Sequence, residues 1–324
     1  MLRQPDPLVP AGLADPSEAA FAAVTVLERL KLLTKEADGV KDGSDIEFVH
    51  RMRVASRRLR TALRVFADCL PRRPHKVWTR LVRQVTRSLS RARDLDVQLD
   101  FIAGMDTRRL KPGFRPGVKR LRLRLKQQRA ALQDEVVRRV ERFESSRVVE
   151  SMHDRLEPLA TEVPAGNALW RRARREISTH LDELLVFLPF VDRPECAKEL
   201  HRMRIATKRL RYSLELFRPL FGDQLEKTID TTKEIQQLLG DIHDYDVWAE
   251  VLPEFARAER TRTLKYYGSD AAFPRLSPGL EYLRRRVAAL RRARYREFAR
   301  FWHQTESDLV WEHLRRTVAA GGNG

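Results

Sequence analysis

The chain has 324 residues, of which 63 are Lys or Arg and 45 are Asp or Glu, so its formal net charge is +18. This excess indicates a polyanionic partner, such as inorganic polyphosphate, nucleic acid or an acidic membrane surface. The sequence shows no apolar run near the roughly 20 residues of a membrane span, no secretory leader and no P-loop, GxGxxG or GxSxG motif. We therefore expect a cytoplasmic protein without a cofactor.

Apolar residues recur with helical periodicity between clusters of Pro, Gly and small polar residues. The first half predicts helices over 17–37, 45–69, 74–103, 115–143 and 145–160. After a joint near 157–168, the second half predicts helices over 167–188, 194–218, 222–251, 277–304 and 306–318. Because no segment alternates with the period of a strand, we expect an all-α protein.

Three segments of the first half return in the second half in the same order. "HRMRVASRRLRTALRVF" at 50–66 matches "HRMRIATKRLRYSLELF" at 201–217, with ten of seventeen positions identical. "LSRARDLDV" at 89–97 matches "LGDIHDYDV" at 239–247, and "RPGVKRLRLR" at 115–124 resembles "SPGLEYLRRR" at 277–286. The repeats predict two antiparallel helical bundles, 17–160 and 161–318, related by internal pseudo-two-fold duplication. Residues 1–16 and 319–324 are predicted to be flexible ends.

The segment 50–66 combines an apolar face with a basic stripe. At about 100° per residue, one face of the helix carries Met52, Ala55, Leu59, Leu63 and Phe66. The second stripe carries His50, Arg53, Arg57, Arg60 and Arg64. Solvated helix faces usually mix acids with bases, but 50–66 contains no acid, and 201–217 admits one only at Glu215. We therefore interpret the stripe as a ligand-binding surface rather than as a solvated face.

Other basic residues extend this predicted surface. The first half adds Arg83, Arg87, Arg91, Arg122 and Lys126, and the second half contributes His201, Arg204, Lys208, Arg211 and Lys233. A guanidinium can hold two phosphate oxygens at once, so a row of arginines suits a ligand with repeated phosphates. The counterpart of the Arg83 stripe keeps only Lys233, which predicts stronger binding by the first half.

The segments 89–97 and 239–247 each carry a pair of carboxylates, Asp94 with Asp96 and Asp244 with Asp246. Together with His243 the second pair is compatible with a metal site of a phosphohydrolase. However, Arg93 occupies the position of His243 in the first copy, so the carboxylates are what the copies share. We favour carboxylates that pair with arginines and orient them, and we expect no metal.

The histidine-bearing segments and the acidic segments that follow them resemble the CHAD family, named for a conserved histidine in an α-helical domain. The resemblance covers about residues 17–318 and implies two helical bundles that bind inorganic polyphosphate in a basic central channel, in some members at polyphosphate granules. His50 and His201, with the basic residues that follow each of them, would line that channel. The CYTH domain of many members is absent from the sequence, which has no ExExK motif, so no triphosphatase activity is expected.

Our leading hypothesis is therefore non-catalytic binding of polyphosphate in a groove shared by the two repeats. Non-specific nucleic-acid binding is the first alternative. The tryptophans fall where large apolar anchors pack rather than at spacings suited to stacking bases, which weakens that alternative. A phosphohydrolase that uses His243, Asp244 and Asp246 is the second. No particular protein partner is indicated.

Overall fold

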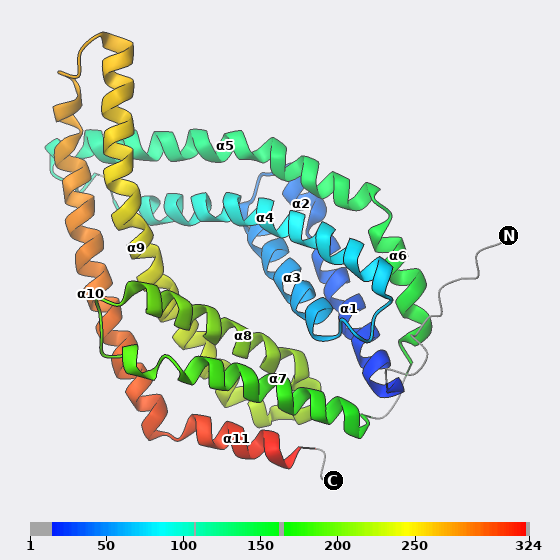
Figure 1. The fold of residues 1–324 in the computed structure, drawn as a ribbon. Coiled ribbons are helices and arrows are strands. Elements are labelled where there is room, and N and C mark those ends of the chain that lie inside the picture. The colour runs from blue at the N-terminus through cyan, green and yellow to red at the C-terminus, as the bar shows by residue number, and fades with distance from the viewer. Residues whose placement is uncertain (1–14, 107, 162–164, 322–324) are drawn as a thin grey trace. The chain divides into compact units, whose positions relative to one another are not determined.

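The computed structural model describes residues 15–106, 108–161 and 165–321, and its regular elements in these ranges are all helices (Figure 1). The α-helices are α1 (Pro16–Thr34), α2 (Ala37–Asp42), α3 (Ile46–Val65), α4 (Arg72–Ala103), α5 (Arg115–Ser145), α6 (Val148–Leu156), α7 (Asn167–Leu185), α8 (Ala197–Phe221), α9 (Glu226–Tyr267), α10 (Ser277–Ser307) and α11 (Val310–Ala320). Short 3-10 turns include η1 (Pro112–Phe114). The predicted all-α fold is confirmed. Within these ranges no helix has both the length and the apolar character needed to cross a bilayer.

Local signals in the sequence explain where several helices begin and end. The Asp15 carboxylate accepts a hydrogen bond from the Ser17 N–H at 2.9 Å at the start of α1, and Asp45 accepts from the Glu47 N–H at 2.8 Å at the start of α3. Gly268 ends α9 with a φ of 70°, a left-handed conformation that glycine adopts without a steric cost.

Several predicted boundaries are wrong. The first predicted helix is interrupted after Thr34, where α2 begins a separate turn of helix. The predicted stops near 218 and 251 are passed, because α8 continues through Pro219 and α9 continues through Pro253. Residues on one face of α9 stay buried beyond that proline, including Glu259 and Thr263, so packing along α10 outweighs the local cost of a proline in a helix. The predicted flexible ends fall mostly on residues 1–14 and 322–324, which lie outside the described residues. In the remaining end residues, α1 begins at Pro16 and α11 ends at Ala320.

The chain divides into two compact units that do not follow the order of the sequence. One comprises Met1–Val97, Gln128–Glu176 and Gly321–Gly324, as far as they are described, and the other comprises Gln98–Gln127 and Ile177–Ala320. The division falls inside α4, α5 and α7. The predicted bundles 17–160 and 161–318 describe sequence repeats rather than these units, and the duplication stays a prediction.

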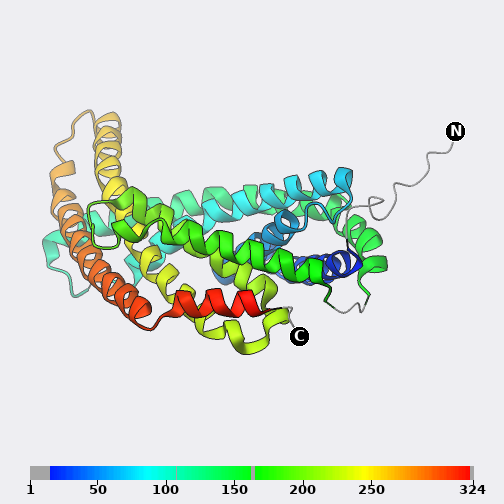
Figure 2. The same ribbon diagram turned by 60° about the horizontal axis from the view of Figure 1, so that its bottom comes forward.

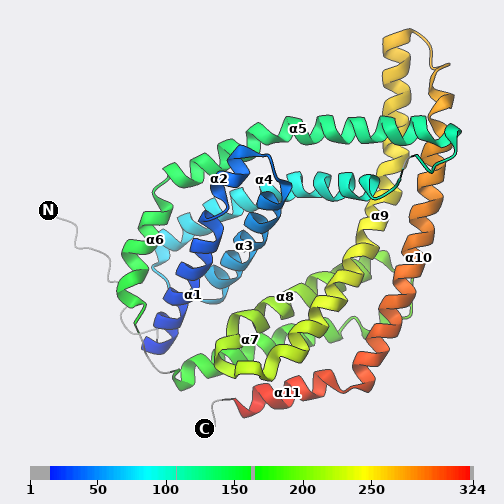
Figure 3. The ribbon, with the colours of Figure 1, turned by 180° about the vertical axis from the view of Figure 1, so that it is seen from behind.

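The core of the first unit forms where α1 packs on α3, which lie side by side in Figure 3. The predicted apolar face of α3 is confirmed, since Met52, Leu59 and Leu63 are completely buried. The buried Arg172 of α7 adds a polar cross-link: it donates to Glu18 of α1 at 2.8 Å and to the Val65 carbonyl of α3 at 2.8 Å. These contacts hold α3 in place and leave its basic stripe on another face.

The second unit is built on α9, which packs along α10 and against α8. Trp248, Phe298 and Trp302 are buried in its core. Arg315 of α11 donates to Asp182 of α7 at 2.5 Å, and the two helices lie side by side in Figure 2. This packing fixes the face of α9 that carries His243.

Two glycines allow a close backbone contact between the beginnings of α5 and α10. A Cβ atom on Gly117 would lie 2.2 Å from the Leu276 carbonyl oxygen, and one on Gly279 would lie 2.2 Å from the Phe114 carbonyl oxygen. Beside them the rings of Phe114 and Tyr282 stack with centroids 5.0 Å apart. Only glycine fits at either position.

Candidate anion-binding site

In the first unit, α3 and α4 bring two of the predicted basic stripes together. The Arg53 Nε donates to Ser90 Oγ of α4 at 3.1 Å, which joins the two helices along their polar faces. Burial lowers the pKa of the Arg60 guanidinium, and the positive charges of Arg83 and Arg87 on α4 lower it further. Two like charges thus converge on a half-buried arginine, an arrangement that an anion would stabilise.

His50 lies half-buried at the start of the same basic surface. Burial lowers the pKa of its imidazole, and the charge of Arg93 on α4 adds to the effect. Its Nδ1 is buried and has no hydrogen-bond partner among the described residues. His50 also lines a cavity of about 240 Å³ together with Arg51 and Arg58. The histidine is therefore mainly neutral at pH 7 and is surrounded by cations.

In the second unit, α8 and α9 build a comparable cluster around His201 and His243. The two Nδ1 atoms lie 3.0 Å apart. Burial lowers the pKa of His201, followed by the charges of Arg204 and Lys208. Burial, Arg204 and His201 lower the pKa of His243 to about 4. Both histidines line a cavity of about 290 Å³.

Some of the predicted site residues lie next to a carboxylate. Arg64 is 3.5 Å from Glu176, Arg91 is 2.8 Å from Glu135, Arg211 is 3.5 Å from Glu215, and Lys233 is 2.8 Å from Asp230. Their charges are already partly neutralised, which makes them weaker candidates than the cluster around Arg60. Arg122 and Lys126 are exposed on the part of α5 that belongs to the second unit.

One aspartate of each predicted pair accepts a hydrogen bond from an arginine. Asp96, with 1% of its side chain exposed, accepts a hydrogen bond from Arg129 Nε at 2.7 Å. Asp246 accepts one from Arg291 Nε at 2.5 Å. Asp94 is exposed and Asp244 is half-buried. Whether these carboxylates orient phosphate-binding arginines stays a prediction.

His243, Asp244 and Asp246 are the residues of the alternative metal site. His243 faces His201, and Asp246 is engaged by Arg291. In the part of the chain that the structure describes, no group of three or more His, Cys, Asp or Glu side chains is arranged to hold a metal ion.

Several residues of these clusters are missing from the sequence-based site. Neighbouring helices bring in Arg93 beside His50, Arg129 beside Asp96 and Arg291 beside Asp246. The signal for Arg129 was partly visible, because it continues a basic stripe on the helix that begins at Arg115. Nothing in the spacing of Arg291 distinguishes it from the other arginines of α10.

The fold and these clusters define a class: an all-helical protein whose basic residues gather around His50 in one cluster and around His201 and His243 in the other. The chain belongs to the CHAD domain family, whose model matches residues 25–253. No CYTH domain is found in it.

Two solved structures show the same fold. The crystal structure of the CHAD domain from the plant Ricinus communis is similar with a TM-score of 0.65 and 22% identity, over 93% of this chain and 97% of that chain. PptA from Streptomyces chartreusis is similar with a TM-score of 0.55 and 14% identity, over 88% of this chain and 99% of that chain. No curated protein matches the sequence.

Proposed function

We propose that the chain binds inorganic polyphosphate without catalysis, through the basic clusters on α3–α4 and α8–α9. The observation that carries the proposal is the convergence of Arg83 and Arg87 on the half-buried Arg60, whose pKa is lowered by burial and further by these two charges. Such repulsion destabilises the free protein, and a bound polyanion would relieve it. Membership of the CHAD family supports the same ligand.

Guanidinium groups suit this ligand because each can donate two parallel hydrogen bonds to phosphate oxygens. The histidines add a second kind of donor. His50, His201 and His243 are held mainly neutral by burial and by nearby cations, and a phosphate chain would raise their pKa values by supplying negative charge. Binding would therefore take up protons near neutral pH.

We propose that a long polymer engages both clusters at once, in a groove that the two clusters share. After one cluster binds, the other meets the same chain at a high effective concentration. Affinity per phosphate should therefore rise with chain length. Binding of this kind would also place the protein at polyphosphate granules.

The absence of catalysis is part of the proposal. The Nδ1 of His201 faces His243 rather than a carboxylate that would orient the ring for general acid–base work. The alternative, a metal-dependent phosphohydrolase, predicts phosphate release from polyphosphate with Mg²⁺ or Mn²⁺. We expect no release above a protein-free control, and metal-dependent turnover that is lost in the His243→Asn variant would support the alternative.

Nucleic acid is the competing polyanion. Trp78, Trp248, Trp302 and Trp311 are buried, so these rings offer no platform on which bases could stack. Contacts to phosphate alone would still allow duplex DNA to bind without sequence preference. The two ligands must therefore be compared directly.

The deciding experiment measures affinity for long-chain polyphosphate at two salt concentrations, with equal phosphate supplied as duplex DNA or as tripolyphosphate. We expect tighter binding to the long polymer than to either competitor, and affinity that falls with salt as counterions are released. Equal or better binding to DNA would instead make the chain a general polyanion binder. Equal affinity per phosphate for tripolyphosphate would contradict the shared groove.

A variant with alanine at Arg53, Arg57, Arg204 and Lys208 tests the site itself. Loss of four charged contacts should weaken binding by at least about 100-fold. A matched control removes four exposed arginines elsewhere, Arg108, Arg109, Arg284 and Arg285, and changes the net charge equally. Similar losses in both variants would show that overall charge, not the proposed clusters, determines binding.

A further inference from the structure

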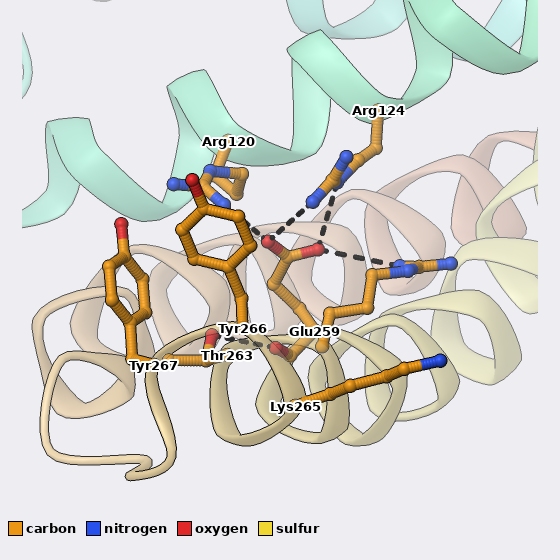
Figure 4. A pocket seen from close by; sticks show the side chains of 8 residues that line it. Arg120, Arg124, Glu259, Thr263, Lys265, Tyr266 and Tyr267 are labelled. Atoms are coloured by element: carbon orange, nitrogen blue, oxygen red, sulfur yellow. Dashed lines mark hydrogen bonds and ion pairs between the residues drawn. The ribbon is translucent and has the colours of Figure 1, made fainter.

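A second basic cavity lies in the second unit, between the first turns of α5 and the last turns of α9 (Figure 4). Its volume is about 540 Å³, within the roughly 300–1,000 Å³ typical of small-molecule sites. The contribution of α9 begins at Glu259, beyond residue 253, where the match to the family model ends. This part of the cavity therefore lies outside the residues that the family model matches.

A buried carboxylate organises the cavity. The Glu259 side chain is 0% exposed and accepts from Arg120 Nη1 at 2.5 Å and from Arg124 Nε at 3.0 Å, both on α5. On α9, Arg262 Nη1 approaches the same carboxylate at 3.4 Å. Burial raises the pKa of Glu259, but the hydrogen bonds from Arg124 and Arg120 outweigh it, so the group is ionised at neutral pH.

The cluster is left with an excess of positive charge. One carboxylate holds three guanidinium groups, and Lys265 adds another cation to the lining. Arg120 and Arg262 remain about half exposed, and each guanidinium has more N–H donors than Glu259 uses. The carboxylate thus fixes several cations in one place without neutralising them, which is a preorganised receptor for an anion with several oxygens.

Two adjacent aromatic rings stand beside these cations. Tyr266 and Tyr267 are 81% and 67% exposed, and their rings meet edge to face with centroids 4.8 Å apart. Figure 4 shows Tyr266 rising from α9 toward Arg120, with Tyr267 next to it. The tyrosines contribute little to the core because they are so exposed. Exposed rings next to guanidinium groups suit a ligand that carries both a planar ring and negative charge.

We propose that this cavity binds a nucleoside triphosphate, with the base against Tyr266 and Tyr267 and the phosphates on Arg120, Arg124 and Arg262. A linear phosphate chain alone would use the arginines and leave the tyrosines without a role. A nucleoside alone would use the rings and leave the excess charge unmatched. Only a ligand with both parts uses the whole lining. This inference does not depend on polyphosphate binding by the clusters on α3–α4 and α8–α9.

Calorimetric titrations of the full chain with ATP, tripolyphosphate and adenosine test the proposal. To separate this cavity from the clusters around His50 and His201, each titration is repeated in the variant with alanine at Arg53, Arg57, Arg204 and Lys208. We expect ATP to bind in both backgrounds, about tenfold more tightly than tripolyphosphate, because one stacked base adds a favourable contact of that order. Adenosine should bind more weakly than either.

Substitutions in the cavity then assign the parts of the ligand. Replacing both tyrosines, Tyr266→Ala with Tyr267→Ala, should lower ATP affinity about tenfold and leave tripolyphosphate affinity unchanged. Arg262→Met should weaken ATP and tripolyphosphate together. Leu264→Ala and Arg260→Met are matched controls, because both residues are exposed on the same helix and neither lines the cavity. All these positions are exposed, so the variants should keep the helical circular dichroism of the parent.

Two results would overturn the proposal. One is ATP binding no tighter than tripolyphosphate, which would make the cavity a site for phosphate chains alone. The other is ATP binding that disappears in the Arg53, Arg57, Arg204 and Lys208 variant while the tyrosine substitutions change nothing, which would place the nucleotide at the polyphosphate clusters. If the chain fails to bind polyphosphate, both of these measurements of ATP binding can still be made and interpreted.

Discussion

The Nδ1 atoms of His201 and His243 lie 3.0 Å apart, so one ring must donate the hydrogen bond and the other must accept it. If both rings were imidazolium ions, two N–H groups would point at each other. The pair therefore accommodates one positive charge at most in this geometry. Burial and Arg204 favour the neutral form of His243, whose pKa falls to about 4.

This pair predicts a loss of stability in mild acid. The pKa of His243 is about 4 in the folded state and near 6.5 in the unfolded state, so the unfolded chain binds more protons between these values. Unfolding becomes more favourable as pH falls from about 6.5 toward 4. Between pH 7.5 and pH 5, the free energy of unfolding should fall in both proteins. The fall should be about 1 kcal/mol smaller in the His243→Asn variant than in the wild type, a figure reduced for solvent screening.

Thermal unfolding at the two pH values measures the difference. His303 is a useful control, because hydrogen bonding to Asp192 raises its pKa, so His303→Asn should not reduce the loss in acid. Equal acid sensitivity of the wild type and the His243→Asn variant would contradict the assignment of a lowered pKa to this pair.

The Arg60 cluster predicts opposite effects on stability and on binding. Arg60→Met removes a half-buried charge from the field of Arg83 and Arg87 and should raise the free energy of unfolding by about 1 kcal/mol in the absence of ligand. The same variant should bind polyphosphate more weakly. Thermal unfolding without ligand and a polyphosphate titration report the two effects separately.

Arg64→Met is the matched control for Arg60→Met. Arg64 lies on the same helix but 3.5 Å from Glu176, so its removal leaves a carboxylate without that partner and should not stabilise the protein. A loss of stability in Arg60→Met as large as in Arg64→Met would show that Arg60 is held by favourable contacts rather than repelled.

Asp96 and Asp94 lie on the same helix, but their substitution should lower the free energy of unfolding by very different amounts. Asp96→Asn breaks an ion pair in which both side chains are largely buried and should destabilise the fold by about 3 kcal/mol. Asp94 is exposed, and Asp94→Asn should change stability by less than about 0.5 kcal/mol. Chemical denaturation of both variants gives the comparison, and equal values would remove the structural distinction between the two aspartates.

The glycine contact between α5 and α10 predicts that a single methyl group added at this contact strongly destabilises the fold. Gly117→Ala would put its Cβ atom 2.2 Å from the Leu276 carbonyl oxygen and should cost about 3 kcal/mol or more. Gly113→Ala is the control, since a Cβ atom there meets nothing within 4 Å, and it should be neutral or stabilising by up to about 1 kcal/mol. Similar melting temperatures for both variants would mean that the helices separate easily.

Features of the fold that depend on neighbouring residues along a single helix could be predicted from the sequence. The apolar face of α3 and the acidic and basic positions of α3, α4, α8 and α9 follow from a period of 3.6 residues, and burial of Met52, Leu59 and Leu63 confirms that face. The continuation of α9 past Pro253 was missed, because it depends on packing against α10 that no local signal records.

The candidate site, too, could be predicted from the sequence only in part. Helical spacing placed Arg60, Arg83 and Arg87 on their stripes, but only the packing of α3 on α4 shows that they converge. The partners of Arg64 and Arg91, Glu176 and Glu135, come from distant segments. Charge on a helix surface is therefore predictable, whereas the identity of the neutralising acid is not.

The contact between Gly117 and Gly279 joins equivalent positions of the matched segments 115–124 and 277–286. A residue that meets its own counterpart is the mark of an isologous interface, the kind that two identical subunits form across a two-fold axis. On the predicted duplication, the single-repeat ancestor would have assembled as a homodimer through this glycine. Fusion of the two genes would then have made the pairing independent of protein concentration. It would also have freed each copy to diverge, and the aligned positions Arg64 and Glu215 are one place where the two segments differ in charge.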